Sequence, residues 1–283
     1  MPRGKGLAVG VVGATGMVGR ELLALLERRR FPVGELLPFS SGRARSAVRF
    51  KGRSLPAPGV SRAALSSCDI VFLVSSDEVA LELAPALAAR GIWTIDDSAA
   101  FRLDRKTPLV IPEVNASALS LKRRLIAGPN CTMTGLAVAG AVLHRVLGVK
   151  EVRVASYQAV SGAGKAALGE LFSQAAALRG LRPERDGRAP VLPPGQSRVL
   201  PRTIVYNAIP QVGRFGADGY SSEEAKVAAE LRKIWSAPAL KLSATAVRIP
   251  TIRGHALAAW LTLSRPITPA RARRILAKTP GLV

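Results

Sequence analysis

A glycine-rich segment near the start of the chain constrains the fold more than any other feature. Gly13–Gly19, with the sequence GATGMVG, follows the apolar run Leu7–Val12 and precedes Arg20–Arg30, where leucines recur at helical spacing. In a strand–turn–helix unit, the first glycine permits the tight turn, the second lets the backbone approach a pyrophosphate and the third allows close packing. The helix N-terminus also favours phosphate. The segment predicts a nucleotide-binding turn, and a tight turn without a ligand is the alternative.

The rest of the first half alternates short apolar runs with helical patterns. Runs typical of buried strands are Ile70–Val74, Ile92–Ile95, Leu109–Ile111 and Leu125–Ala127, and Val79–Arg90 is predicted to be a helix. This alternation predicts an α/β fold with a Rossmann-type, doubly wound parallel sheet, which binds ligands at the carboxyl ends of its strands.

The pattern changes to that of an α+β domain after Gly128–Pro129. We expect helices at Thr132–Leu147 and Ser222–Trp235, and strands at Val152–Ala155, Ile204–Asn207, Val247–Ile249 and His255–Leu263. The stretch Arg179–Arg202 is rich in Pro and Arg and is predicted to be a surface excursion. Because 283 residues exceed one ordinary core, we expect two domains, residues 1–129 and 130–283.

The charge of the chain suggests an anionic partner. There are 41 Lys and Arg against 19 Asp and Glu, a net charge of +22. A nucleic acid would suit that charge, but the basic residues are scattered apart from Arg28–Arg30, and aromatic residues make up only 5%. These features argue against a nucleic-acid partner and are compatible with small anionic ligands.

The cysteine content and the length of the apolar runs indicate the cellular compartment of the chain. Two cysteines make no disulfide framework, and two histidines offer no metal-ligand spacing, so we expect a reducing, cytoplasmic setting and no metal. No apolar run reaches the length of a membrane span. Arg3 and Lys5 before Leu7–Gly19 imitate a signal peptide, but the glycines and the charged helix that follows argue against one.

The stretch Leu36–Arg45, taken as equivalent to the segment after the second strand of NAD sites, indicates which dinucleotide would fit the turn. In NAD sites an acidic side chain there binds the ribose 2′-hydroxyl. After Glu35, the stretch Leu36–Arg45 has no carboxylate and offers Ser40, Ser41, Arg43 and Arg45. Hydroxyl and guanidinium groups suit a 2′-phosphate, so NADP is preferred, with an exposed basic loop as the alternative.

Cys131 is the candidate nucleophile. It follows a Gly-Pro break and opens an apolar helix, where the helix dipole favours the thiolate. A buried inert cysteine is the alternative, and it suits Cys68 better. His255, after Gly254 at a strand start, is the candidate acid/base, whereas His144 within an apolar helix is expected to be structural. Arg248 is suited to bind a carboxylate bidentately, or else lies on a sheet surface.

Eight collinear segments resemble those of the aspartate-semialdehyde dehydrogenase family. They are VGATGMVGRE, IDDSAAFRLD, LVIPEVN, PNCT, YQAVSGAGKAALGEL, NAIPQVGRFG, GYSSEEAKVAAELRKI and VRIPTIRGHA. The resemblance implies NADPH-dependent reduction of L-aspartyl 4-phosphate to L-aspartate 4-semialdehyde through a cysteine thioester, in lysine, threonine and methionine biosynthesis. It also implies a homodimer or homotetramer, with residues 130–283 as the catalytic and dimerisation domain.

The resemblance assigns roles to matching positions. It implies Cys131 as the acyl-accepting thiol, His255 as the acid/base and Gln158 as the residue orienting thiol and substrate. Implied substrate-binding residues are Arg102 and Lys226 for phosphate, Asn130 for the pocket wall, Glu223 for the amino group and Arg248 for the carboxylate. The candidate cofactor-binding residues are Gly13, Thr15, Gly16, Met17 and Val18 in the glycine turn, Ser40 and Arg43 from the loop chemistry above, and Ser161 and Gly162, with Gly164 in the last of these turns.

The chain departs from the family pattern in places. The family usually has Asn at Gly128 and often Ser at Thr132, and its loop arginine falls at Gly42, so Arg43 or Arg45 must substitute. Family members also continue several tens of residues beyond Val283, so we expect exposed strand edges, bare apolar surface, reduced stability and weak NADP affinity. The alternatives are a catalytically impaired or inactive truncated relative and N-acetyl-γ-glutamyl-phosphate reductase, whose thiol segment differs from PNCT.

Overall fold

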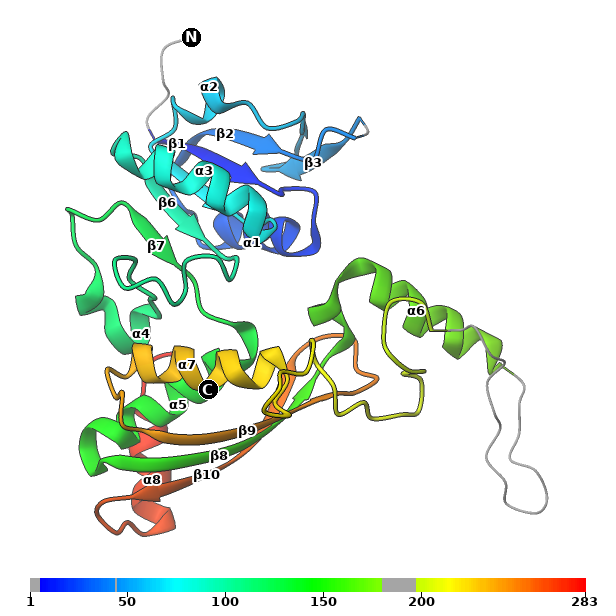
Figure 1. Cartoon of the computed structure of the whole chain (residues 1–283). Coiled ribbons are helices and arrows are strands. Elements are labelled where there is room, and N and C mark those ends of the chain that lie inside the picture. Colours follow the sequence, from blue (N-terminus) through cyan, green and yellow to red (C-terminus); the bar gives the residue numbers. More distant parts are fainter. Residues whose placement is uncertain (1–5, 44, 180–196) are drawn as a thin grey trace. The chain divides into compact units, whose positions relative to one another are not determined.

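The computed structural model describes residues 6–43, 45–179 and 197–283 (Figure 1). The chain divides into two compact units, Met1–Asn130 and Cys131–Val283, and each is described by itself.

The first unit is built on a five-stranded sheet in which all neighbouring strands are parallel. The strand order is β2 (Val33–Phe39), β1 (Leu7–Val12), β5 (Ile70–Leu73), β6 (Trp93–Asp96) and β7 (Leu125–Ala127). The helices are α1 (Met17–Arg28), α2 (Arg62–Leu65), α3 (Asp77–Ala89), α4 (Pro112–Asn115) and the 3₁₀ turn η1 (Ala116–Ala118).

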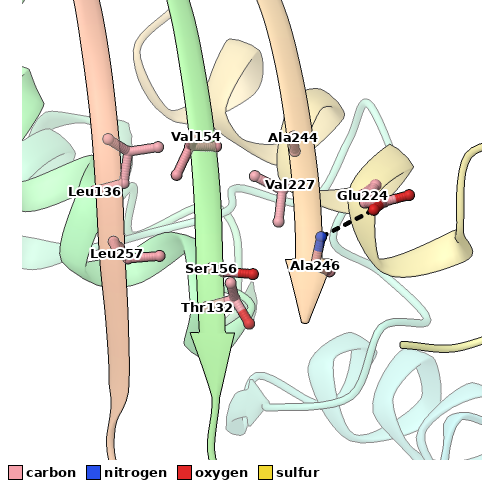
Figure 2. A pocket seen from close by; sticks show the side chains of 9 residues that line it. All are labelled: Thr132, Leu136, Val154, Ser156, Glu224, Val227, Ala244, Ala246 and Leu257. Atoms are coloured by element: carbon pink, nitrogen blue, oxygen red, sulfur yellow. Dashed lines mark hydrogen bonds between the residues drawn. The ribbon is translucent and has the colours of Figure 1, made fainter. Parts of the chain in front are cut away.

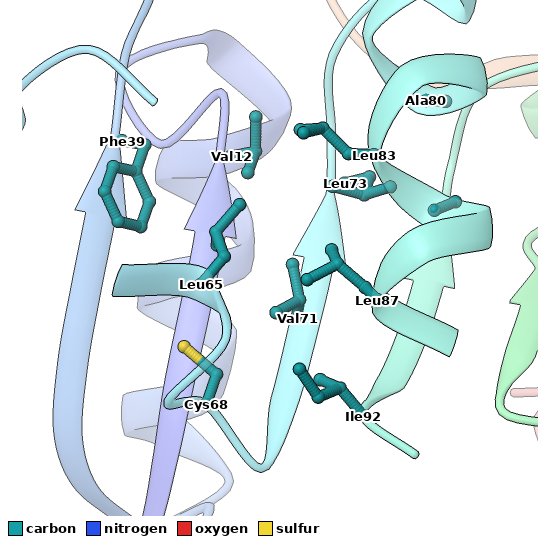
Figure 3. Close-up of a cluster of buried hydrophobic side chains, with 11 residues drawn as sticks. Val12, Phe39, Leu65, Cys68, Val71, Leu73, Ala80, Leu83, Leu87 and Ile92 are labelled. Carbon is teal, nitrogen blue, oxygen red and sulfur yellow. The ribbon is translucent and has the colours of Figure 1, made fainter. Parts of the chain in front are cut away.

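Apolar clusters cover both faces of this sheet. On one face Val12 and Leu73 pack with Leu83 and Leu87 of α3, and the buried Cys68 lies in the same cluster (Figure 3). A second cluster joins Val9 and Val11 of β1 to Leu23 and Leu26 of α1. Successive side chains of a strand point to opposite faces, so β1 contributes to both clusters. The doubly wound parallel sheet predicted from the sequence is therefore confirmed, as is the structural, buried character of Cys68.

The hairpin of β3 (Ala47–Phe50) and β4 (Arg53–Pro56) was not expected from the sequence. Its two turn residues, Lys51 and Gly52, have φ angles of 47° and 75°. Two consecutive positive φ angles are typical of type I′ hairpin turns, in which Asn-Gly is the usual pair. Because Lys51 stands where asparagine is usual, the sequence does not indicate this turn.

The second unit contains a three-stranded sheet with helices on one face. The central strand β8 (Val149–Gln158) pairs antiparallel with β10 (His255–Leu263) and parallel with β9 (Lys241–Arg248). The helices are α5 (Cys131–Leu147), α6 (Gly164–Ala177), α7 (Ser222–Ile234), α8 (Pro269–Leu276) and the 3₁₀ turn η2 (Val160–Ala163). Figure 1 shows α5 and α7 lying along the sheet, which matches the alternation of buried and exposed residues in β8.

Trp235 anchors α7 to α5. Its indole N–H donates to the Ala137 carbonyl at 3.1 Å, and its ring stacks on His144 with centroids 5.1 Å apart. His144 Nδ1 also accepts a hydrogen bond from the Val149 N–H at 3.2 Å. These contacts confirm that His144 is structural.

Two predicted strands are wrong. Leu109–Ile111 is buried but forms only an isolated bridge from Leu109 to Ala127, because Pro112 begins α4 immediately afterwards. Ile204–Asn207 is irregular: the Ile204 and Val205 N–H groups donate to Gln174 Oε1 at 2.9 and 3.2 Å instead of to a neighbouring strand. Its apolar side chains pack against α6.

The predicted surface excursion Arg179–Arg202 lies mostly outside the described residues, which resume at residue 197. From residue 197 onward, the chain is hydrogen-bonded to α6 through the buried Glu170. Its carboxylate accepts hydrogen bonds from the Arg198 and Val199 N–H groups at 2.9 and 2.7 Å.

Candidate active site

The glycine turn of the first unit has the geometry of a nucleotide cradle. Gly13 has a φ of 87°, and a Cβ there would lie 2.3 Å from the Val74 carbonyl oxygen. A Cβ at Gly19 would lie 2.3 Å from the Gly13 oxygen, so this position too admits only glycine. Gly16 caps α1 without a side-chain hydrogen bond. Met17 and Val18 are in the first turn of α1, and the amides of a helix N-terminus suit a pyrophosphate.

The loop after β2 contains the residues predicted to select the dinucleotide. Ser40 is buried; its hydroxyl donates to the Ala57 carbonyl at 2.7 Å and accepts from the Gly42 N–H at 3.2 Å. Its side chain therefore shapes the loop. Arg43 and Arg45 are exposed in the same loop. Thr15 lies in the glycine turn, where its carbonyl accepts from Arg20 Nε at 3.1 Å.

Arg102 and Asn130 are the substrate residues predicted in the first unit. Arg102 follows the carboxyl end of β6, is buried, and donates from Nη2 to the Asp97 carbonyl at 2.7 Å. Asp96 at the end of β6 is fully buried, and burial raises the pKa of its carboxyl group. Asn130 is buried beside Cys131 in the chain.

A thiol and an imidazole face each other in the second unit. Cys131 is the first residue of α5, and its Sγ lies 3.3 Å from His255 Nε2. The Ala159 N–H donates to His255 Nδ1 at 3.1 Å and so holds the ring in this orientation. Burial lowers the pKa of His255, as does the charge of Arg248, so the imidazole is neutral at pH 7. The helix start favours the thiolate.

The three strands of the sheet place Gln158, Arg248 and His255 in one row. Gln158 ends β8 and is paired in register with Arg248 at the end of β9 and with His255 at the start of β10. The buried Arg248 donates from Nη1 to the Ala159 carbonyl at 2.8 Å, and burial lowers the pKa of its guanidinium. The register thus brings Gln158 beside two residues that lie 90 and 97 positions later in the chain.

Glu223 completes this cluster from the first turn of α7. Its Oε1 accepts hydrogen bonds from Thr132 Oγ1 at 2.8 Å and from Gln158 Nε2 at 3.4 Å. A capping box between Ser221 and Glu224 begins the helix and sets the position of Glu223. Lys226 lies one turn further along α7 and is half-buried.

Gly162, expected beside the cofactor, lies against two of the substrate-side residues. A Cβ at Gly162 would lie 2.9 Å from Arg248 Nη1 and 3.5 Å from His255 Cε1. Ser161 shares the turn η2 and donates its N–H to the Ile252 carbonyl at 3.4 Å. The turn therefore packs closely over the arginine and the histidine.

Sequence reasoning missed Ala159. Its N–H positions His255 and its carbonyl positions Arg248. Both contributions come from the main chain, so no side-chain pattern could have indicated them.

A parallel-sheet nucleotide-binding unit joined to a unit with a cysteine–histidine pair defines the class as a dehydrogenase. Two family models match the chain: Semialdehyde dehydrogenase, NAD binding domain, over residues 8–122, and Semialdehyde dehydrogenase, dimerisation domain, over residues 140–283. The chain belongs to the semialdehyde dehydrogenase family, as the sequence predicted.

Named relatives are similar over nearly the whole chain. It is 36% identical to the aspartate-semialdehyde dehydrogenase of Legionella pneumophila, covering 98% of this chain and 77% of the relative. It is 37% identical to that of Bacillus subtilis (strain 168), covering 99% and 80%. The solved structure of aspartate semialdehyde dehydrogenase II from Vibrio cholerae has a TM-score of 0.90 and 34% identity, covering 98% of this chain and 80% of that one. Among the described residues, no helix is long and apolar enough to cross a membrane.

Proposed function

We propose that the chain reduces L-aspartyl 4-phosphate to L-aspartate 4-semialdehyde with NADPH, and runs the phosphate-dependent reverse reaction, with Cys131 as the covalent acceptor. The observation that carries the proposal is the 3.3 Å approach of Cys131 Sγ to His255 Nε2 at the start of α5. Relatives that are aspartate-semialdehyde dehydrogenases support the choice of substrate. A similar structure from Vibrio cholerae is described as complexed with ASA.

The chemistry follows from the residues around the thiol. The Cys131 thiolate attacks the acyl carbon and expels phosphate, which leaves a thioester. NADPH, when bound, supplies the hydride that reduces the thioester carbon. His255 exchanges a proton with the oxygen of the resulting hemithioacetal, and its lowered pKa keeps it available as a base at neutral pH. Collapse of the hemithioacetal releases the aldehyde and restores the thiolate.

The charged residues around the pair suit an amino acid. Arg248 presents a guanidinium for the α-carboxylate, and Glu223 presents a carboxylate for the ammonium group. Gln158 lies between Arg248 and His255 in the row of strand ends. By the family resemblance, Arg102 and Lys226 bind the phosphate and Asn130 shapes the pocket.

The direct test is phosphate-dependent NADP⁺ reduction with L-aspartate 4-semialdehyde. Cys131→Ala should abolish the reaction, whereas Cys68→Ala, which alters the other cysteine in the core of the first unit, should retain it. Equal rates for Cys131→Ala and the unaltered chain would refute the covalent mechanism. Absence of activity in the unaltered chain, with NADP binding intact, would favour the inactive relative.

We propose NADP rather than NAD as the cofactor. The loop after β2 presents Arg43 and Arg45 and, from Leu36 to Ser46, no carboxylate that would bind a 2′-hydroxyl. Arg43→Ala should raise KM for NADP⁺ at least tenfold and leave KM for NAD⁺ unchanged, since a charge-assisted hydrogen bond is worth about 1.5–3 kcal/mol. Arg53→Ala on β4 is the control. Equal effects of Arg43→Ala on both cofactors would contradict the assignment.

We propose a homodimer formed through the open face of the second sheet. Arg153 and Tyr157 of β8 and Trp260 of β10 share the face opposite to Val152 and Val154. Trp260 is 66% exposed and Tyr157 is 40% exposed, so two large aromatic side chains of this face are accessible to a partner. Trp260→Glu should convert a dimer to a monomer in light scattering, whereas Phe172→Glu on α6 should not. A Trp260→Glu variant that remains dimeric would exclude this face.

We also propose a cytoplasmic location, because a reducing compartment keeps the nucleophilic Cys131 thiol reduced. Export of the chain to an oxidising compartment should therefore inactivate it reversibly, with thiol reductant restoring activity.

A further inference from the structure

Thr132, the residue after Cys131, is hydrogen-bonded to Glu223, whose carboxylate is proposed to bind the ammonium group of the substrate. Thr132 lies in the first turn of α5 and is only 2% exposed. Its Oγ1 donates a hydrogen bond of 2.8 Å to Glu223 Oε1. The same residue thus joins the helix that begins at the thiol to the helix that carries Glu223.

A second donor converges on the same oxygen. Gln158 Nε2 lies 3.4 Å from Glu223 Oε1 and 3.2 Å from Ser156 Oγ, on the inward face of β8. An ionised carboxylate only accepts hydrogen bonds, so both contacts restrict its rotation. The Thr132 contact is the shorter, and it comes from a side chain with a single, stiff χ1 torsion. Thr132 is therefore the stronger constraint on the carboxylate.

The Thr132 side chain also lines a small cavity in the second unit. Thr132 and Ser156 lie close together at one end of a small cavity of about 10 Å³, which is otherwise lined mainly by apolar side chains such as Leu136, Val154 and Leu257 (Figure 2). Replacing the hydroxyl with a methyl group therefore changes the shape very little and removes the hydrogen bond that Thr132 donates to Glu223.

We propose that Thr132 is a positioning residue for substrate selection: its hydroxyl orients the Glu223 carboxylate toward the ammonium group of the amino-acid substrate. The inference rests on the function proposed above for this site. It gives Thr132 a role in recognising the amine and none in the bond-making steps at sulfur. The effect of losing the hydroxyl should therefore appear in substrate affinity and depend on the presence of an ammonium group.

The test compares Thr132→Val, which removes the hydroxyl, with Thr132→Ser, which keeps it. Thr132→Val should raise KM for L-aspartate 4-semialdehyde about 10- to 100-fold, as expected for a lost hydrogen bond to a charged group, with kcat changed less than about threefold. Thr132→Ser should stay within about threefold of the unaltered chain. The inhibition constant of succinate semialdehyde, which lacks the ammonium group, should be the same in all three proteins.

Controls separate positioning from damage to the fold. The melting temperature and the rate of Cys131 alkylation by iodoacetamide should not change in Thr132→Val. In a Glu223→Gln background, Thr132→Val should add little further loss, since the two residues act through one interaction.

Several outcomes would overturn the inference. These are an unchanged KM in Thr132→Val, equal losses in the Val and Ser variants, equally weakened binding of succinate semialdehyde, or additive losses with Glu223→Gln. An unaltered chain that does not use L-aspartate 4-semialdehyde would refute the proposed function itself. An active chain with an unaffected Thr132→Val variant would refute only the role of Thr132.

Discussion

Gly162→Ala tests whether the close packing of η2 determines the position of Arg248. A Cβ at this position would lie 2.9 Å from Arg248 Nη1, whereas ordinary contacts begin at about 3.4 Å. The guanidinium would have to move by about 0.5 Å. Arg248 is buried, and its Nη1 is hydrogen-bonded to the Ala159 carbonyl at 2.8 Å, so the movement must break or distort that contact.

The expected loss follows from the contact that is disturbed. A hydrogen bond to a charged group contributes about 1.5–3 kcal/mol, so a misplaced Arg248 should raise KM for the semialdehyde about 10- to 150-fold. Crowding a packed site costs about 1–3 kcal/mol of folding free energy, which is a fall of several degrees in melting temperature. His255, at 3.5 Å from the added carbon, should move less, so kcat should fall by a smaller factor than KM rises.

The assay is steady-state kinetics in the oxidative direction together with thermal melting. Gly169→Ala is the matched control, because it lies in α6 of the same unit and an added Cβ there meets no atom within 4 Å. That variant should have unchanged kinetics and equal or slightly higher stability. A Gly162→Ala enzyme with the KM of the unaltered chain would show that Arg248 does not depend on this packing or does not bind the substrate.

Three further predictions concern other contacts. Burial, and then the charge of Arg248, lower the pKa of His255 from its ordinary value of 6.5. The neutral base therefore persists to lower pH, and the rate of the oxidative reaction should be retained down to pH 6.5 and decline only below it. A loss of rate that begins above pH 6.5 would contradict the assignment. Gly140→Ala, whose Cβ would lie 2.5 Å from the Trp235 ring, should lower the melting temperature by several degrees, whereas Gly135→Ala, with its nearest neighbour at 3.6 Å, should not. Glu170→Ala removes the acceptor for the Arg198 and Val199 amides and should speed proteolysis near residue 198, with unchanged cleavage as the contrary result.

Features that depend on neighbouring residues in the chain were predictable from the sequence. The strand–turn–helix unit from Leu7 to Arg28 follows from glycine positions that only a glycine can occupy. The place of Cys131 at a helix start follows from the Gly-Pro break before an apolar run. His255 at the start of β10 follows from Gly254 and the apolar residues after it. Each signal lies within about ten residues, the range over which backbone geometry and periodicity act.

The errors have more than one physical cause. Ile204–Asn207 has the composition of a strand, yet Gln174 accepts its buried amide hydrogens and no neighbouring strand is needed. Both residues of the Lys51–Gly52 turn have positive φ angles, which lysine rarely adopts, so the sequence did not indicate the hairpin. Local propensity is weak compared with burial and hydrogen bonding, and these are decided by the folded chain.

The sequence by itself thus determined the class of fold, the nucleotide turn and the chemical identity of the thiol, the imidazole and the arginine. Only the tertiary structure decided how these groups meet: the sheet register aligns Gln158, Arg248 and His255, and the Ala159 backbone orients two of them. It also decided that Thr132 points its hydroxyl at Glu223, 91 residues away. The physical reason is that a strand register and a main-chain hydrogen bond relate residues through space, and neither leaves a pattern in the order of side chains.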